Sequence, residues 1–412
     1  MTFKQKIYKF LRWLEQFTGT DMIYLTHGAF WLTLEKVIEV LIGLGLMILF
    51  GRLITKEVFG AYQYVLSITG LLSIFSLPGL DTALIRTVAK GNEKMLAVCF
   101  KEKNKWSLLG SFVLLLIAGW YFWHQNSLLG ICFIIVALFL PFINSFLLFS
   151  DFWQGKKRFD LQNKYLIMFN LLANPVLILF IIFTKKLTLI IFGYYLGYTL
   201  AGAIFYFLTV KKVADGKKEK ETISFGKHLT LMNAVSTVAA YFDKIVLWHF
   251  LGPLAVATYY FAERPTAKMR ELLPISTLAL PKLSQRNIKE IKKGLWQKFL
   301  KLFLVAGSVI IVYVVLCPYF YKWLFPAYLN SVFYSQVLAL CLIFMPFNLL
   351  GAALTAEMRK KELYVLSFVT PASKIILFLI LIPFWGIWGI IFSIQASYLI
   401  NSLLTLYFFR KI

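Results

Sequence analysis

Charged residues are scarce in this sequence, and acidic residues are the scarcest. Only 15% of the 412 residues are charged, against about 25% in an average soluble chain. The 19 Asp and Glu are outnumbered by 43 Lys and Arg, and the four cysteines show no CxxC or metal-ligand spacing. This composition excludes a soluble enzyme, a disordered chain and a disulfide-linked secreted scaffold. We interpret Cys99, Cys132, Cys317 and Cys341 as small apolar residues of helices.

Apolar residues make up 60% of the chain, and they gather in long blocks. A membrane-spanning helix needs about 20 mostly apolar residues. Twelve such windows can be placed, with 225–251 and 253–279 as the seventh and eighth on either side of Leu251-Gly252-Pro253. The sequence therefore predicts an all-α integral membrane protein with twelve transmembrane helices.

The net charge of +24 would indicate nucleic-acid binding in a soluble protein, but here the basic residues fall in alternate loops. Cytoplasmic loops of membrane proteins carry an excess of Lys and Arg. This pattern predicts a multi-pass protein of the plasma (inner) membrane with both termini in the cytoplasm, and it argues against a nucleic-acid partner. Residues 1–22 place apolar and basic side chains at helical spacing, so we expect a cytoplasmic amphipathic segment at the membrane interface.

Weak internal similarity divides the chain into halves. At a shift of 200 residues, Ile190-Ile191-Phe192 aligns with Ile390-Ile391-Phe392, and Tyr198 meets Tyr398. We predict an N-lobe at 23–210 with helices 1–6, a cytoplasmic linker at 211–224 and a C-lobe at 225–412 with helices 7–12. Because six is an even number, a pseudo-two-fold axis along the membrane normal would relate the two six-helix lobes.

Several basic residues lie inside the predicted spans, where each would cost about 2.5–3.5 kcal/mol at a helix centre. They must therefore face water, an acidic partner or an anionic ligand. We predict that five of them bind an anionic substrate: Lys36, Lys244, Arg264, Lys268 and Lys374.

Acidic residues in the same spans are candidate charge partners or ion-coupling groups: Glu35, Glu39, Asp243 and Glu263. A further set, Asp81, Arg86 and Arg270, is expected at the inner mouth, where Asp81 could pair with Arg86. The alternative interpretation is structural, because Glu35–Lys36–Glu39 and Asp243–Lys244 can each neutralise themselves and fix helix packing.

Two stretches resemble the polysaccharide-exporter branch of the MOP superfamily, the Wzx-type flippases. One runs from Gly51 to Tyr62 and continues over Pro78–Arg86. The other is Tyr241–Val246, followed by Leu251-Gly252-Pro253 and the helix of Tyr259-Tyr260, with His249 and Phe250 as a departure from the family pattern. The resemblance implies two six-helix lobes around a central cationic cavity.

The resemblance also implies a flippase that moves a polyprenyl-diphosphate-linked oligosaccharide from the inner to the outer leaflet by alternating access. Such a protein is not an enzyme and has no catalytic residue, metal or cofactor, although coupling to a proton or sodium ion is left open. The expected partners are the lipid-linked glycan, the bilayer and polysaccharide-assembly proteins around a monomer. The alternatives are a MATE-like drug/cation antiporter and a membrane-embedded glycan polymerase or ligase.

Overall fold

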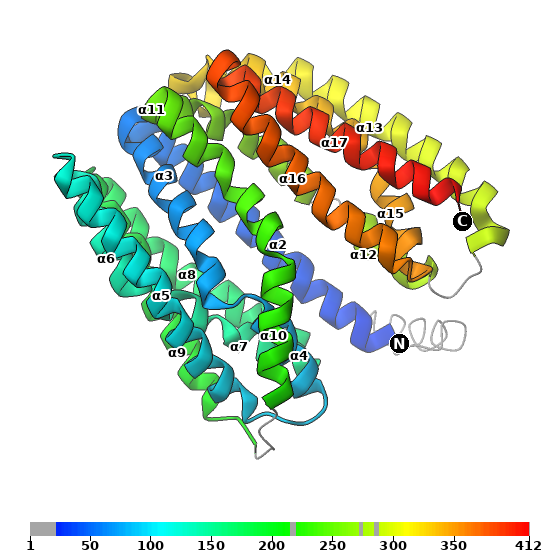
Figure 1. Cartoon of the computed structure of the whole chain (residues 1–412), viewed down its shortest axis with the longest axis horizontal. Helices are drawn as coiled ribbons and strands as arrows, with labels where there is room; N and C mark the ends of the chain where they lie inside the picture. Colours follow the sequence, from blue (N-terminus) through cyan, green and yellow to red (C-terminus); the bar gives the residue numbers. More distant parts are fainter. Residues whose placement is uncertain (1–21, 215–219, 272–274, 284–287, 412) are drawn as a thin grey trace, which may run out of the picture. The chain divides into compact units, whose positions relative to one another are not determined.

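The computed structural model describes residues 22–214, 220–271, 275–283 and 288–411, and all regular elements within these ranges are helices (Figure 1). The predicted amphipathic segment 1–22 lies almost entirely outside the described residues. The helices of the first half are α2 (Met22–Leu53), α3 (Lys56–Leu72), η1 (Ser73–Ser76), α4 (Gly79–Ala89), α5 (Met95–Trp123), α6 (Ser127–Phe146), α7 (Leu148–Gly155), α8 (Phe159–Phe183) and α9 (Leu187–Val210). Those of the second half are α10 (Lys220–Met232), α11 (Ala234–Glu271), α12 (Ile275–Leu283), α13 (Ile288–Leu324), η2 (Pro326–Tyr328), α14 (Ser331–Ala339), η3 (Leu340–Phe344), α15 (Phe347–Ala356), α16 (Lys360–Trp385) and α17 (Ile387–Arg410).

Ten helical segments among the described residues are long and apolar enough to cross a membrane. Large apolar side chains are exposed along them, as in α13, where Leu304 and Ile311 are 71% and 66% exposed. A soluble protein does not expose apolar surface on this scale, whereas acyl chains cover it without cost. The chain is therefore an all-helical, multi-pass membrane protein, as predicted.

The helix ends follow local sequence. A tight turn follows α5: α6 begins at Ser127, and the Asn126 side chain accepts a hydrogen bond of 3.2 Å from the Leu129 N–H. This capping contact satisfies one of the N–H groups that the first turn of a helix leaves without a partner.

Packing divides the chain into two compact units. Unit 1 comprises the described residues of Met1–Met47 and Leu72–Met232, and in it α5, α6, α8 and α9 lie side by side (Figure 1). Leu80, Phe149 and Phe152 belong to its core, which joins α4, α5, α7, α8 and α9. The bounds of the units and of the predicted lobes are not the same: 48–71 of the predicted N-lobe groups with unit 2, and 225–232 of the predicted C-lobe groups with unit 1, as does the described end of the predicted linker, 220–224.

Unit 2 comprises Ile48–Leu71 and the described residues of Asn233–Ile412. Its core includes Val256, Phe378 and Ile390, where α11, α16 and α17 pack together. The segment Ile48–Leu71 comes from the first half of the chain and packs on the rest of unit 2 through α3. There Gly60 lies directly against the Pro253 carbonyl group. A β-carbon at residue 60 would stand 1.9 Å from that oxygen, so only glycine allows this approach.

A second close contact joins α10 to α4 inside unit 1. Gly79 and Gly226 bring the two helices together, and the hydroxyl groups of Thr87 and Thr222 lie 2.9 Å apart. Only Asn233 separates α10 from α11, which belongs to unit 2. The predicted seventh span, 225–251, is therefore broken at Asn233 into two helices.

Candidate substrate cavity on α11

The helix α11 is a hairpin of two arms, because Gly252 breaks it with φ 74° and ψ −171°. This φ lies in the region that favours glycine, and Pro253 follows it. The Tyr259 hydroxyl group donates a hydrogen bond of 2.7 Å to Asp243, although an unbroken helix would place these residues, 16 apart, about 24 Å from each other. The arms therefore fold back on one another, and the turn predicted at Leu251-Gly252-Pro253 is present.

Two lysines surround the single carboxylate of Asp243, which is 4% exposed. The Lys244 Nζ lies 3.4 Å from each of its oxygens, and the Lys244 backbone N–H donates to it at 2.8 Å. Lys374 of α16 donates to the Ala239 carbonyl at 3.2 Å, and its charge also acts on Asp243. The acid nearest in charge to Lys374 thus lies on α11, since the one acid of α16, Glu362, is three turns away at the start of that helix.

The second arm of α11 carries another half-buried group. Glu263 lies 3.6 Å from the guanidinium group of Arg270, which also donates a hydrogen bond to the Tyr398 hydroxyl of α17. The same guanidinium stands over the Tyr398 ring, 5.1 Å from its centroid. Arg270 is therefore held in place by a carboxylate, a hydroxyl group and an aromatic face.

A cavity of about 390 Å³ opens beside this group, inside unit 2. Arg264 and Arg270 line it together with the neutral donors Asn348, Asn401 and Ser402, and the remaining lining residues are Glu263, Ala267, Glu271, Cys341, Phe344, Met345 and Tyr398. Guanidinium, amide and hydroxyl groups are the donors that bind phosphate and carboxylate oxygens. The wall can therefore receive an anion, and the two acids limit where the anion can lie.

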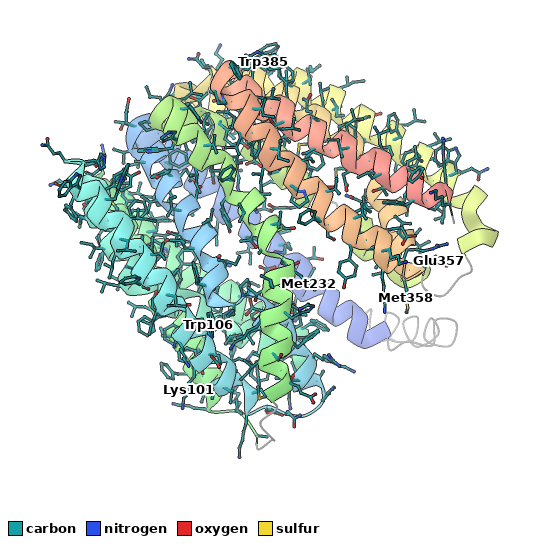
Figure 2. The ribbon with its side chains drawn as sticks, in the orientation of Figure 1. Lys101, Trp106, Met232, Glu357, Met358 and Trp385 are labelled. Atoms are coloured by element: carbon teal, nitrogen blue, oxygen red, sulfur yellow. The ribbon has the colours of Figure 1, made fainter. Side chains whose placement is uncertain are left out.

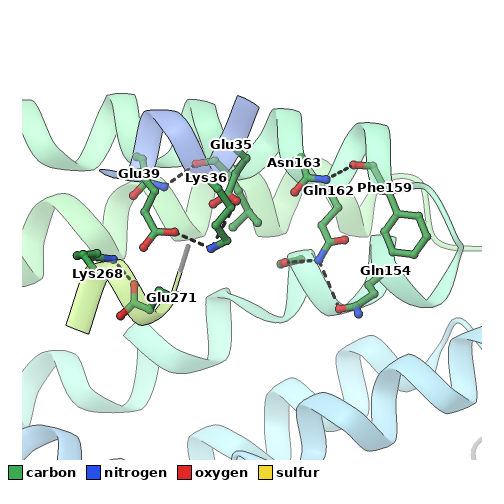
Figure 3. A network of polar contacts seen from close by, with 12 residues as sticks. Glu35, Lys36, Glu39, Gln154, Phe159, Gln162, Asn163, Lys268 and Glu271 are labelled. Atoms are coloured by element: carbon green, nitrogen blue, oxygen red, sulfur yellow. Dashed lines mark hydrogen bonds and ion pairs between the residues drawn. The ribbon is translucent and has the colours of Figure 1, made fainter. Parts of the chain in front are cut away.

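The remaining predicted substrate residues are engaged in ion pairs. The Lys268 Nζ lies 2.5 Å from Glu271, one turn further along α11 (Figure 3). In unit 1, the Lys36 Nζ lies 2.6 Å from Glu39 and 3.6 Å from Glu35 (Figure 3). The geometry of Glu35–Lys36–Glu39 is that of the self-neutralising alternative.

The predicted inner-mouth residues are not brought together as a group. Asp81 forms an ion pair with the buried Lys103 of α5, whereas the Arg86 guanidinium stands over the Phe225 ring, 5.2 Å from its centroid. Burial raises the pKa of Asp81 above its ordinary value, and this effect outweighs the opposing charge of Lys103. Sequence reasoning missed Lys103, although its position one turn after the buried Cys99 marks it as facing the core.

Two aromatic residues of α11 that could stack on sugar rings instead contact aromatic rings of α3. Trp248 stacks on Tyr64 with ring centroids 4.4 Å apart, and Tyr260 meets Phe59 edge-on at 5.2 Å. Two aromatic residues do line the cavity, Phe344 and Tyr398. Sequence reasoning noticed Tyr398 only as part of the internal repeat.

Comparison with known proteins identifies the family. Residues 25–286 match a family model described as polysaccharide biosynthesis protein. The chain belongs to this family. A Shigella flexneri protein named as an O-antigen transporter is 22% identical to it over 318 residues, which cover 70% of this chain and 73% of that protein.

Solved structures support the fold. The lipid II flippase MurJ, in an inward closed conformation, has a TM-score of 0.72 at 15% identity, with 92% of this chain and 86% of that chain covered. An outward-facing MATE multidrug transporter of the MOP superfamily has a TM-score of 0.58 at 14% identity, with 94% of each chain covered. The family match confirms the predicted polysaccharide family, and these structures show that the chain has the fold of MOP-superfamily transporters.

Proposed function

We propose that the chain is a flippase that carries a polyprenyl-diphosphate-linked oligosaccharide from the inner to the outer leaflet by alternating access. One observation carries this proposal: a cavity inside a membrane-embedded unit is lined by Arg264, Arg270 and several neutral hydrogen-bond donors. The family, and the relative named as an O-antigen transporter, support a glycan-bearing substrate and a role in cell-surface polysaccharide synthesis.

The charge balance around α11 favours an anionic substrate. Among the described residues of this region, the basic side chains Lys244, Arg264, Arg270 and Lys374 stand beside the acids Asp243 and Glu263, and Lys268 pairs with Glu271. Basic side chains therefore outnumber acidic ones in this part of the described chain. Stripping a diphosphate of water costs tens of kcal/mol by Born estimates. Two guanidinium groups that can bind it through paired hydrogen bonds offset much of this cost, whereas a lysine-rich wall would offer only point charges.

The membrane arrangement that we propose has twelve spans. The ten long segments become eleven when α11 is counted as two arms at Gly252, and α2, with 32 residues, is the twelfth. Six spans in each half fit the predicted lobes and their pseudo-two-fold axis. We propose that the protein lies in the plasma membrane, with its basic loops and both termini on the cytoplasmic side.

The carboxylates of the cluster have a second proposed task. Asp243 and Glu263 keep Lys244 and Arg270 in position while the cavity is empty, and either acid could carry a coupling proton or sodium ion during the return step. Neither task requires a cofactor, a metal or a catalytic residue, so we propose a transporter that is not an enzyme. We expect it to act as a monomer beside polysaccharide-assembly proteins.

Arg264→Ala tests this proposal, with Arg359→Ala as a matched control. Arg359 forms a half-exposed pair with Glu362 at the start of α16 and does not line the cavity. Hydrogen bonds to a charged group contribute about 1.5–3 kcal/mol each, so Arg264→Ala should reduce glycolipid delivery to the outer leaflet by roughly 10- to 100-fold. Delivery equal to that of Arg359→Ala, at equal protein levels in the membrane, would contradict the assignment.

The acids on the cavity wall favour one alternative, a MATE-like drug/cation antiporter. In that case Glu263→Gln would abolish export of a cationic dye, and Arg264→Ala would leave that export intact.

A glycan polymerase or ligase would instead lengthen a glycan in a reconstituted assay, whereas our proposal expects the glycan to move between leaflets with its length unchanged.

A further inference from the structure

A second hollow lies in unit 1, between α5 and α10, and it shares no lining residue with the cavity on α11. It holds about 490 Å³. Its apolar floor consists of Ala97 and Val98 of α5 and Ile223 of α10. Three lysines stand along the same hollow, at the start of α5 and in its first turns: Lys94, Lys101 and Lys105. We call this hollow the lysine groove.

The single acid that lines the lysine groove, Glu102, is directed to another lysine. Its carboxylate lies 4.0 Å from the Nζ of Lys227 on α10, and that Nζ also stands over the Trp106 ring, 4.9 Å from the centroid. Glu102 therefore helps to hold α10 against α5. Among the described residues, none forms an ion pair with the exposed Lys101 or Lys105, so the groove keeps an excess of positive charge.

The depth of the lysine groove matches the headgroup region of a bilayer. The lysines lie at the N-cap and in the first three turns of α5, and the apolar part of the helix begins directly after Trp106. Figure 2 shows Lys101 near the N-terminal end of α5 and Trp106 further along the helix. Tryptophan is enriched at membrane interfaces, and basic pockets between helices at this level recognise anionic lipid headgroups.

We propose that the lysine groove binds an anionic glycerophospholipid, with its phosphate beside Lys101 and Lys105 and its headgroup over the floor of Ala97, Val98 and Ile223. Its acyl chains then lie on the apolar part of α5 that follows Trp106. The acyl chains distinguish this ligand from a free phosphate, which would gain nothing from the apolar part of α5 next to the groove. A lipid in this position touches both α5 and α10, so it ties α10 to unit 1 alongside the contact of α10 with α4.

Native mass spectrometry of the purified full chain in detergent tests this site. The probes are phosphatidylglycerol and phosphatidylcholine with identical acyl chains. Each lysine near an anionic headgroup contributes about 1 kcal/mol, so the double variant Lys101→Gln/Lys105→Gln should weaken phosphatidylglycerol binding by roughly 10- to 30-fold. Its binding of phosphatidylcholine should stay unchanged. The control Lys90→Gln/Lys211→Gln removes the same charge from exposed lysines outside the groove and should keep the affinity of the natural sequence.

A second variant tests the site with all lysines present. Ala97 is exposed on the groove, so Ala97→Glu places an acid among the lysines without filling the core, and it should also weaken phosphatidylglycerol binding. Equal losses in the groove and control variants would overturn the proposal in favour of diffuse attraction. Displacement of phosphatidylglycerol by millimolar glycerol phosphate would overturn it in favour of a soluble anion, and displacement by equimolar polyprenyl diphosphate would overturn it in favour of a substrate port.

Discussion

The contact of Gly60 with Pro253 gives a sharp test of how unit 2 is packed. In Gly60→Ala the new β-carbon would lie 1.9 Å from the Pro253 carbonyl oxygen and 2.6 Å from its carbon. Both atoms belong to the backbone and cannot rotate aside, so α3 and α11 must separate by about 1 Å before the contact reaches even 3.0 Å. Overpacking of this kind costs about 1–3 kcal/mol, and we take the upper end because no side chain can yield.

Helix propensity opposes this cost, because alanine is favoured over glycine by about 1 kcal/mol inside a helix. A net loss of about 2 kcal/mol remains, and in a unit of this size each kcal/mol lowers Tm by about 2–4 °C. Gly60→Ala should therefore melt roughly 4–8 °C below the natural sequence. Gly307→Ala on α13 is the matched control, since a β-carbon there meets no atom within 4 Å, and its Tm should stay level or rise.

The four buried free cysteines supply the assay for this comparison. Cys99, Cys132, Cys317 and Cys341 are shielded in the folded chain, so a thiol-reactive dye reports unfolding of the purified protein in detergent during a temperature ramp. If Gly60→Ala and Gly307→Ala melt within about 1 °C of each other, the packing of α3 on α11 described above is wrong.

Two further predictions concern buried polar contacts. Tyr259→Phe removes the hydrogen bond to Asp243 and should cost about 1.5–3 kcal/mol of stability, measured by the same dye, whereas losses that simply add in a double-mutant cycle with Asp243→Asn would contradict this contact. Burial favours a higher pKa for Glu93, but hydrogen bonds from Lys156 and from the Ala214 N–H outweigh it and hold this pKa below its ordinary value. The stabilisation is therefore present at neutral pH and is lost as the pH falls through the folded-state pKa, so Glu93→Gln should lower Tm at pH ~7 and lower it less at pH ~4. A Tm difference that does not change with pH would contradict the assignment to Glu93.

The sequence was sufficient for the class and for much of the helix pattern, because these depend on local composition, whereas the family came from the resemblance of two short stretches to known members. Long apolar runs predict spans from residues within about 20 positions of each other. Turns such as those at Asn126 and Gly252 follow from the capping and backbone preferences of single residues. The conclusion that the chain is a multi-pass membrane protein rested on signals of this kind.

Contacts between distant residues could not be predicted in the same way. Arg270 meets Tyr398, 128 residues away, and Asp81 pairs with Lys103 where the sequence suggested Arg86. Helical periodicity indicates which face of a helix a residue occupies, but it does not indicate which other helix packs against that face. Lys374 shows the same limit, since the charge that balances it lies on α11 and not on its own helix.

The way in which the chain is divided between its units limits where it can bend. The polypeptide passes from one unit to the other three times: within α2 after Met47, at the end of α3 after Leu71, and at Asn233. Any change in the mutual orientation of the units must be absorbed by torsion angles at these three crossings. Two of them coincide with an interruption of the α-helix, namely the 3₁₀ turn η1 and Asn233. The third lies inside a continuous helix, close to Gly43 and Gly45, which lack the β-carbon that restricts backbone torsion angles and have open space around them.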